Sequence, residues 1–112
     1  MEKSRYLLTI IVPTFNEVEN ISNFISTIKE ILKKTNFQIL FVDDNSTDGT
    51  TEEIQKFSNL MPNVNLILRI GRRGLSGACI EGIQNSESKY VAIMDCDLQH
   101  DEKLLIEMLN EL

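Results

Sequence analysis

Residues 90–101 read YVAIMDCDLQHD, and the organisation of the chain follows from this stretch. An apolar run, Tyr90–Met94, leads into an acidic loop, the pattern of a buried strand that runs out into polar residues. Side chains at i, i+2 and i+4 of an extended segment face the same side. Asp95, Asp97 and Gln99 therefore direct three oxygen atoms to one point, a set that suits a hard cation such as Mg²⁺ or Mn²⁺. For a D-x-D motif taken alone, solvated loop acids or helix caps remain the alternative.

The composition limits the classes of protein to consider. The chain has 112 residues, enough for one small domain, with 42% hydrophobic and 25% charged residues. Its 11 basic and 17 acidic residues give a net charge of −6, which disfavours nucleic-acid binding. Cys79 and Cys96 lack the spacing of metal ligands, and we expect reduced thiols and a cytoplasmic location. No apolar run reaches the length of a membrane span.

The spacing of apolar residues predicts strands and helices in alternation. Short β-branched runs predict four strands, at Leu7–Val12, Phe37–Val42, Val64–Ile70 and Tyr90–Met94. Apolar residues at steps of three and four predict four helices, at 18–32, 50–60, 75–83 and 104–112. We expect Pro13 to end the first strand and Asn16 to cap the first helix. The alternation implies a parallel sheet with helices on both faces. Because the last helix lacks a C-cap, we expect residues 1–112 to be the N-terminal part of a longer domain.

Every distinctive polar cluster follows a predicted strand. The clusters are Pro13–Glu17, Asp43–Asp48, Gly71–Gly77 and Asp95–Gln99. In an open parallel sheet, ligands bind beyond the carboxyl ends of the strands, where the strand order reverses. With the order 3-2-1-4, the first and last clusters flank one crevice, and Asp44 lies beside them. This convergence predicts a metal-assisted nucleotide site.

Each cluster also has a structural alternative. Asp43 is suited to capping the second helix, whereas Asp44 is placed to accept hydrogen bonds from a base edge. Phe15 belongs either to the core or to a stacking surface for the base, and Glu17 is also placed to interact with a helix dipole. The arginines near the glycine-rich loop are either solvated or suited to a diphosphate. These arginines are Arg69, Arg72 and Arg73.

With these residues assembled, the chain resembles the family 2 glycosyltransferases of the GT-A fold. The matching stretches are IIVPTFNEVENI (10–21), ILFVDDNSTDGT (39–50), RRGLSGACIEGI (72–83) and YVAIMDCDLQHDE (90–102). The D-x-D-L-Q-H run is most like that of the polyprenol-phosphate (dolichyl-phosphate) mannosyltransferases. The resemblance covers nearly the whole chain and implies a Rossmann-like, nucleotide-binding half of a GT-A domain.

The resemblance also implies roles for single residues. Asp95, Asp97 and Gln99 would hold the Mg²⁺ or Mn²⁺ that bridges the donor diphosphate, and the catalytic role falls to Asp97. In the nucleotide pocket, Val42 would lie against the base and Asp44 would read its edge. The full set of implied donor-binding residues is Pro13, Phe15, Glu17, Val42, Asp44, Arg73 and Cys96.

The implied reaction is an inverting, metal-dependent transfer of a hexose, mannose from GDP-mannose, to a polyprenyl or dolichyl phosphate at the cytoplasmic membrane surface. The phosphate nucleophile is already anionic, which fits the absence of an evident catalytic His or Lys. A UDP-sugar donor and a non-catalytic nucleotide-sugar-binding fragment remain alternatives. A receiver-type signalling module is disfavoured because its paired acids should follow the first strand, where this chain has Pro13. The unpaired edge of the fourth strand invites a homo-oligomer.

Overall fold

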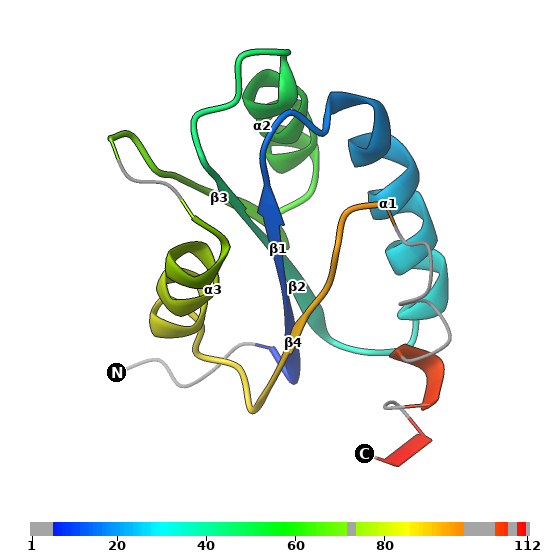
Figure 1. The fold of residues 1–112 in the computed structure, drawn as a ribbon. Coiled ribbons are helices and arrows are strands. Elements are labelled where there is room, and N and C mark those ends of the chain that lie inside the picture. Colours follow the sequence, from blue (N-terminus) through cyan, green and yellow to red (C-terminus); the bar gives the residue numbers. More distant parts are fainter. Residues whose placement is uncertain (1–5, 72–73, 98–104, 108–109, 112) are drawn as a thin grey trace.

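The computed structural model describes residues 6–71, 74–97, 105–107 and 110–111. Within them, one parallel sheet runs through the molecule in the order β3-β2-β1-β4 (Figure 1). Its strands are β1 (Leu8–Thr14), β2 (Phe37–Asp43), β3 (Val64–Leu68) and β4 (Tyr90–Ile93). The structure thus confirms the predicted strand order, although β3 and β4 end earlier than their apolar runs suggest.

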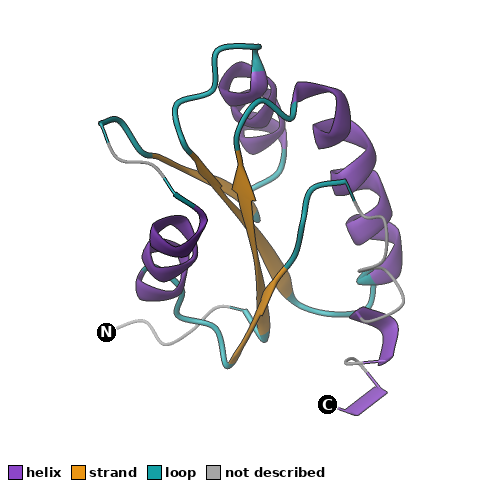
Figure 2. Ribbon diagram, in the orientation of Figure 1, coloured by secondary structure: helices purple, strands orange, loops and turns teal. Residues whose placement is uncertain are grey.

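Helices cover both faces of the sheet, as predicted (Figure 2). The helices α1 (Val18–Ile31) and α2 (Thr50–Leu60) pack on one face, and α3 (Leu75–Gln84) packs on the other. Residues 105–107 and 110–111 are helical, within the predicted last helix. Leu105 is buried there against the core on the side of α1. The remaining residues of that predicted helix lie outside the described part of the chain.

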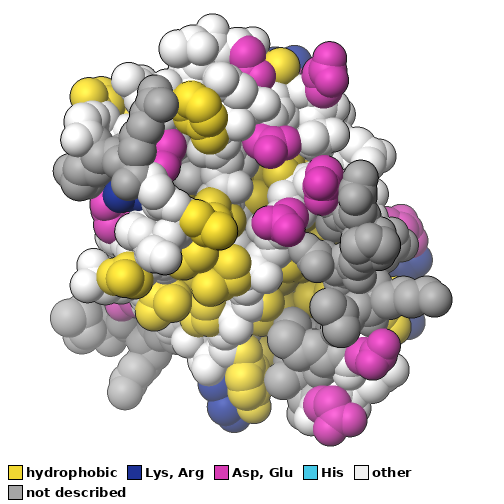
Figure 3. Space-filling model, viewed as in Figure 1, with side chains coloured by type: hydrophobic (Ala, Val, Ile, Leu, Met, Phe, Trp, Pro, Cys, Tyr) yellow, Lys and Arg dark blue, Asp and Glu magenta, His cyan; other side chains and the backbone are white. Residues whose placement is uncertain are grey.

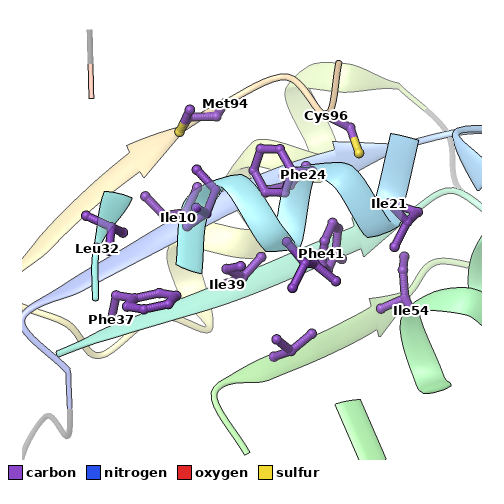
Figure 4. Packing of buried hydrophobic residues seen from close by; sticks show 14 of the residues in the cluster. Ile10, Ile21, Phe24, Leu32, Phe37, Ile39, Phe41, Ile54, Met94 and Cys96 are labelled. Carbon is purple, nitrogen blue, oxygen red and sulfur yellow. The ribbon is translucent and has the colours of Figure 1, made fainter. Parts of the chain in front are cut away.

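The larger core fills the space between α1, α2 and the sheet (Figure 4). The helix α1 buries four side chains at helical spacing, Ile21, Phe24, Ile25 and Ile28. Its Phe24 meets Phe41 of β2 edge to face, with ring centroids 6.0 Å apart and planes at 67°. Such pairs contribute about 0.5–1.5 kcal/mol beyond the burial of their area. This packing fixes α1, and with it the loop before α1, against the sheet.

The smaller core lies under α3, where the helix approaches β1 closely. It consists of Ile11, Leu40, Val42 and Ala78, all buried. A Cβ atom added to Gly82 would lie 2.6 Å from Ile11 Cγ2, far inside van der Waals contact. The glycine in this helix is therefore required by the approach of α3 to the sheet, despite its cost to helix stability.

Pro13 does not end the first strand, contrary to the sequence prediction. The strand continues to Thr14, and Pro13 pairs in register with Val42 of β2. The oxygen of Thr14 accepts from Asp44 N on the β2 side, whereas that of Ile11 accepts from Met94 N on the β4 side. By this alternation Pro13 faces the β4 side, where β4 has already ended. Because no strand lies beside Pro13 on that side, its lack of an N–H group costs the sheet no hydrogen bond.

A hydrophobic surface lies between α3 and β4 (Figure 3). Its exposed members are Ile80, Ile83, Val91 and Ile93. The helix α3 packs on β1 and β2, so this face of β4 is left uncovered by the described residues. Association through the edge of β4 stays a prediction.

We expect Gly82→Ala to lower the free energy of unfolding by about 1–3 kcal/mol, because the new methyl group must displace Ile11 or the helix. Gln84→Ala, at an exposed position of the same helix, is the matched control and should change stability by less than about 0.5 kcal/mol. Urea denaturation followed by circular dichroism measures both. Equal stability of Gly82→Ala and the wild type would contradict the close approach.

Candidate functional site

The carboxyl ends of β1, β2 and β4 bring the predicted clusters to one edge of the sheet. The register pairs Thr14 of β1 with Asp43 of β2, and Ile11 of β1 with Ile93 of β4. The chain after β1 crosses to β2 on one side, and the chain after α3 returns to β4 on the other. The loops that follow β1 and β4 therefore meet at the switch point of the sheet, where α/β proteins bind ligands.

Reciprocal hydrogen bonds join the loop after β1 to the loop after β2. Asn16 N donates to Ser46 Oγ over 2.8 Å, and Thr47 N donates to Asn16 Oδ1 over 2.9 Å. Asn16 has φ of +54°, in the left-handed region that Asn tolerates better than most residues. Asn16 is therefore not the N-cap that the sequence predicts, because its side chain bonds the neighbouring loop instead of α1.

Asp48 holds the beginnings of two helices. Its Oδ2 accepts from Val18 N at 3.2 Å, the first residue of α1, and its Oδ1 accepts from Thr50 N at 3.0 Å, the first residue of α2. Glu17 N donates to Thr50 Oγ1 at 2.8 Å and adds a further link between the loops. The hydrogen bond from the Thr50 hydroxyl is the main cause that lowers the pKa of Asp48 from its usual value.

Asp43 is fully buried and accepts four hydrogen bonds. Its Oδ1 accepts from the hydroxyls of Thr14 at 2.6 Å and Ser46 at 2.7 Å. Its Oδ2 accepts from Ser46 N at 2.8 Å and from the Thr51 hydroxyl at 2.9 Å. A carboxylate has room for about four such bonds. Asp43 is thus occupied in joining β1, the loop after β2 and α2. It is not the cap of α2 that the sequence suggests, because it bonds the Thr51 hydroxyl and no backbone N–H of that helix.

Asp44 points the other way, toward the start of α3. It is 8% exposed, and its Oδ2 accepts from Gly74 N at 2.9 Å. Arg69 Nη1 lies 3.1 Å from Asp44 Oδ1, and Arg69 Nε lies 3.2 Å from Glu81 Oε1. Arg69 is only 4% exposed. The prediction of a solvated Arg69 is therefore wrong, and the prediction of a diphosphate ligand stays a prediction.

The residues after β4 alternate between the core and the solvent. Met94 and Cys96 are buried in the larger core, whereas Asp95 and Asp97 are exposed on the opposite side. Figure 4 shows Met94 and Cys96 among the buried side chains of this core. The carboxylates of the D-x-D motif thus share the outward side expected from their spacing. Gln99, the third predicted ligand, lies outside the described residues.

Burial, together with the nearby carboxylates of Glu17 and Asp97, raises the pKa of the Cys96 thiol to about 12. The thiol is therefore uncharged at neutral pH. Both cysteines are free of disulfides, as expected.

The other predicted donor-binding residues differ in their accessibility. Phe15 is 42% exposed, so the alternative that placed it in the core is wrong. Pro13 and Glu17 are half-buried. Val42 is fully buried in the smaller core, so its backbone rather than its side chain is the part placed to meet a ligand. Arg73 lies outside the described residues.

Two cavities show where a ligand could enter. One of about 240 Å³ lies at the start of α1 and is lined by Asn16–Asn20 and Asp48. Acidic side chains gather on this upper part of the surface, between the end of β4 and α1 (Figure 3). A larger cavity of about 380 Å³ lies at the opposite end of the sheet, lined by Tyr6, Thr35–Phe37, Pro62 and Asn63. That lining carries no charged group, so the larger cavity is a poor fit for a nucleotide diphosphate.

No three His, Cys, Asp or Glu side chains of the described part of the chain form a ready-made metal site. Asp95 and Asp97 supply two carboxylates for one. None of the described helices is long and apolar enough to cross a membrane.

Comparisons with known proteins give consistent matches. The family model described as Glycosyl transferase family 2 matches residues 9–112. The dolichol-phosphate mannosyltransferase of Pyrococcus furiosus is 36% identical over 102 residues, which cover 91% of this chain and 29% of that protein. Its counterpart in Saccharomyces cerevisiae is 36% identical over 109 residues, which cover 93% of this chain and 40% of that protein.

A solved structure is similar as well. A mannosyltransferase from Pyrobaculum calidifontis, in complex with GDP-Man and Mn²⁺, superposes with a TM-score of 0.74 at 27% identity. The match covers 94% of this chain and 32% of that one. The chain thus spans less than half the length of the relatives reported above.

We expect Asp43→Ala to lower the free energy of unfolding by about 3 kcal/mol or more, because four donors, all buried or partly buried, lose their acceptor at once. Asp95→Ala removes an exposed carboxylate at the same edge of the sheet and should change stability by less than about 0.5 kcal/mol. Thermal and urea denaturation measure both variants. A small loss for Asp43→Ala, similar to that of Asp95→Ala, would argue against the structural role.

Proposed function

Since the chain belongs to glycosyl transferase family 2, we propose that it forms the donor-binding part of an enzyme that transfers a hexose from a nucleotide diphosphate sugar to a polyprenyl phosphate. Its parallel sheet of order β3-β2-β1-β4 with helices on both faces has the GT-A fold. The observation that carries the proposal is the sheet order, which puts the loops after β1, β2 and β4 at the carboxyl ends of adjacent strands, with Glu17, Asp44 and the Asp95–Asp97 segment in them. Such a place suits a nucleotide, and the acids suit the cation that accompanies its diphosphate.

The proposed donor is GDP-mannose. Two relatives are named dolichol-phosphate mannosyltransferases, and the similar solved structure holds GDP-Man. In this chain the exposed ring of Phe15 offers a face for stacking on the base. Asp44, at the end of β2, offers a carboxylate to the N–H groups of the base edge. A UDP-sugar is the alternative donor, and the choice depends on which base edge Asp44 accepts from.

The metal proposal rests on the chemistry of the available ligands. Asp95 and Asp97 present carboxylate oxygens on one side of the chain, whereas the thiol between them is buried and uncharged. Oxygen ligands without a thiolate suit Mg²⁺ or Mn²⁺. We assign Asp95, Asp97 and Gln99 as the residues that would hold the ion. When bound, a divalent cation neutralises the charge that develops on the leaving diphosphate.

The proposed reaction requires this part of the chain to bind and orient the donor. An oxygen of the acceptor phosphate attacks the anomeric carbon, the bond to the donor diphosphate breaks, and the configuration inverts. The nucleoside diphosphate leaves with the electron pair of that bond. The residues of this chain bind the base, orient the diphosphate and hold the anomeric carbon open to in-line attack. Because the acceptor is already an anion, no general base has to be provided here.

We expect the chain to bind GDP in a manner that depends on Mn²⁺ or Mg²⁺, and Asp97→Asn to reduce that metal-dependent affinity about tenfold or more, because one ligand loses its charge. Glu30→Gln, which removes an exposed carboxylate from the far end of α1, is the matched control and should bind as the wild type does. Isothermal calorimetry with and without the metal gives the comparison.

Undiminished metal-dependent binding by Asp97→Asn would contradict the metal assignment. Tighter binding of UDP than of GDP would instead favour the UDP-sugar donor. Failure of the folded wild-type chain to bind either nucleotide would contradict the proposed function.

We expect Asp44→Asn to weaken GDP binding by about 1–3 kcal/mol, because the base loses a charged hydrogen-bond acceptor. The amide oxygen can still accept from Gly74 N, and Arg69 keeps Glu81 as an ionic partner, so we expect a much smaller loss of stability than for Asp43→Ala. Calorimetry and thermal denaturation on the same samples separate binding from folding. Normal affinity combined with a large drop in melting temperature would mean that Asp44 is structural only.

A further inference from the structure

Arg69 is a buried cation at the edge of the candidate site, and it lies within ion-pair distance of Asp44 and Glu81. Its backbone N donates to Asp43 O at 2.8 Å, which extends the pairing of β3 with β2 beyond the end of β3. From there its side chain runs beneath the first turn of α3. A guanidinium carries five N–H donors in a planar fork, so it can serve several partners at once.

The guanidinium and Asp44 hold the backbone of Gly74 from both sides. Gly74 N donates to Asp44 Oδ2 at 2.9 Å, and Gly74 O accepts from Arg69 Nη1 at 3.0 Å. Gly74 has φ of +122°, a conformation that residues with a side chain rarely adopt. The peptide groups on either side of Gly74 are therefore oriented by two side chains that also contact each other.

The helix α3 lies directly on this guanidinium. A Cβ atom added to Gly77 would lie 2.7 Å from Arg69 Nη2. The absence of a side chain at Gly77 thus makes room for Arg69, and the position of Arg69 is determined by the helix above it as well as by its ionic partners.

The two oxygens of Asp44 are used differently. Oδ2 is bonded to Gly74 N, whereas Oδ1 lies 3.1 Å from Arg69 Nη1 without the alignment of a hydrogen bond. Within the described residues, Oδ1 is buried and has no hydrogen-bond donor. The ion pair orients the carboxylate and leaves Oδ1 with acceptor capacity. Counting formal charges, one Arg against Asp44 and Glu81 leaves one negative charge, which favours N–H donors of a base over further acceptors.

We propose that Arg69 is a positioning residue for base recognition: it acts through the Asp44 carboxylate and the Gly74 carbonyl, and it does not touch the nucleotide. This inference rests on the proposed function, because it assumes that Asp44 meets the base. It predicts that Arg69 contributes to the part of the affinity that depends on the base and not to the part that depends on the diphosphate. A purely structural role would weaken both parts together.

The test compares GDP with pyrophosphate, which lacks the base, by calorimetry in Mg²⁺. Arg69→Lys keeps the positive charge but loses the planar fork that reaches Asp44 and Gly74 O together. We expect it to weaken GDP binding about tenfold or more and to leave pyrophosphate affinity within about twofold. Glu81→Gln, which leaves the contact of Arg69 with Asp44 in place, is the matched control and should bind GDP within about threefold of the wild type.

A double-mutant cycle identifies the residue through which Arg69 acts. In the Asp44→Asn background, Arg69→Lys should weaken GDP binding by less than about threefold, because the carboxylate that it orients is already absent. Should Arg69→Lys fail to fold, Gly77→Ala offers a second variant, since its methyl group displaces the guanidinium without removing it. The expected result is the same selective loss of GDP affinity.

Three results would overturn the inference. They are wild-type GDP affinity in both folded variants, equal losses for GDP and pyrophosphate, and effects of Arg69→Lys and Asp44→Asn that simply add. A folded wild-type chain that binds neither ligand would overturn the proposed function instead, and the role of Arg69 with it.

Discussion

The helices α1, α2 and α3 depend on three aspartates at the end of β2 and in the loop after it for hydrogen bonds at their first turns. Asp48 accepts from the first residues of α1 and α2, Asp44 accepts from the residue that precedes α3, and Asp43 accepts from the Thr51 hydroxyl in α2. The N–H groups at a helix start have no partner within the helix, and buried polar groups are costly to leave unpaired. One short loop therefore fixes the start of each of these helices relative to β2. The candidate site occupies the same edge of the sheet for this reason.

Much of the fold follows from apolar spacing, because spacing reflects which side chains can be buried. The run Thr50–Leu60 predicts α2 with its observed bounds, and the alternation of strands and helices predicts the parallel sheet. Pro13 was misjudged because the effect of a proline depends on which neighbour faces its nitrogen, and that neighbour is set by the length of β4. The prediction that Asn16 caps α1 is wrong because Asn16 bonds residues of another loop, and the residues next to it in the sequence do not reveal that contact.

In the candidate site, too, some features follow from the local sequence and others depend on tertiary packing. The exposure of Asp95 and Asp97 follows from alternation along the chain, which is a local property. The pairing of Arg69 with Asp44 and Glu81 depends on how closely α3 approaches the sheet, and that approach depends on Gly77 and Gly82. The burial of the arginine beneath these glycines was not predictable, because nothing in the order of residues distinguishes a buried arginine from a solvated one.

The hydrogen bonds that Asp48 accepts also affect the chemical stability of the protein. Asp48 precedes Gly49, and Asp-Gly pairs in open loops are prone to isomerisation, in which the following backbone nitrogen attacks the side-chain carboxyl to form a succinimide. Here both oxygens of that carboxyl are bonded to Val18 and Thr50, so the group is held by two helices while the fold persists. Isomerisation at Asp48-Gly49 should therefore take place in unfolded molecules. Each isomerised molecule would then refold without the carboxylate in the place that joins the two helix starts.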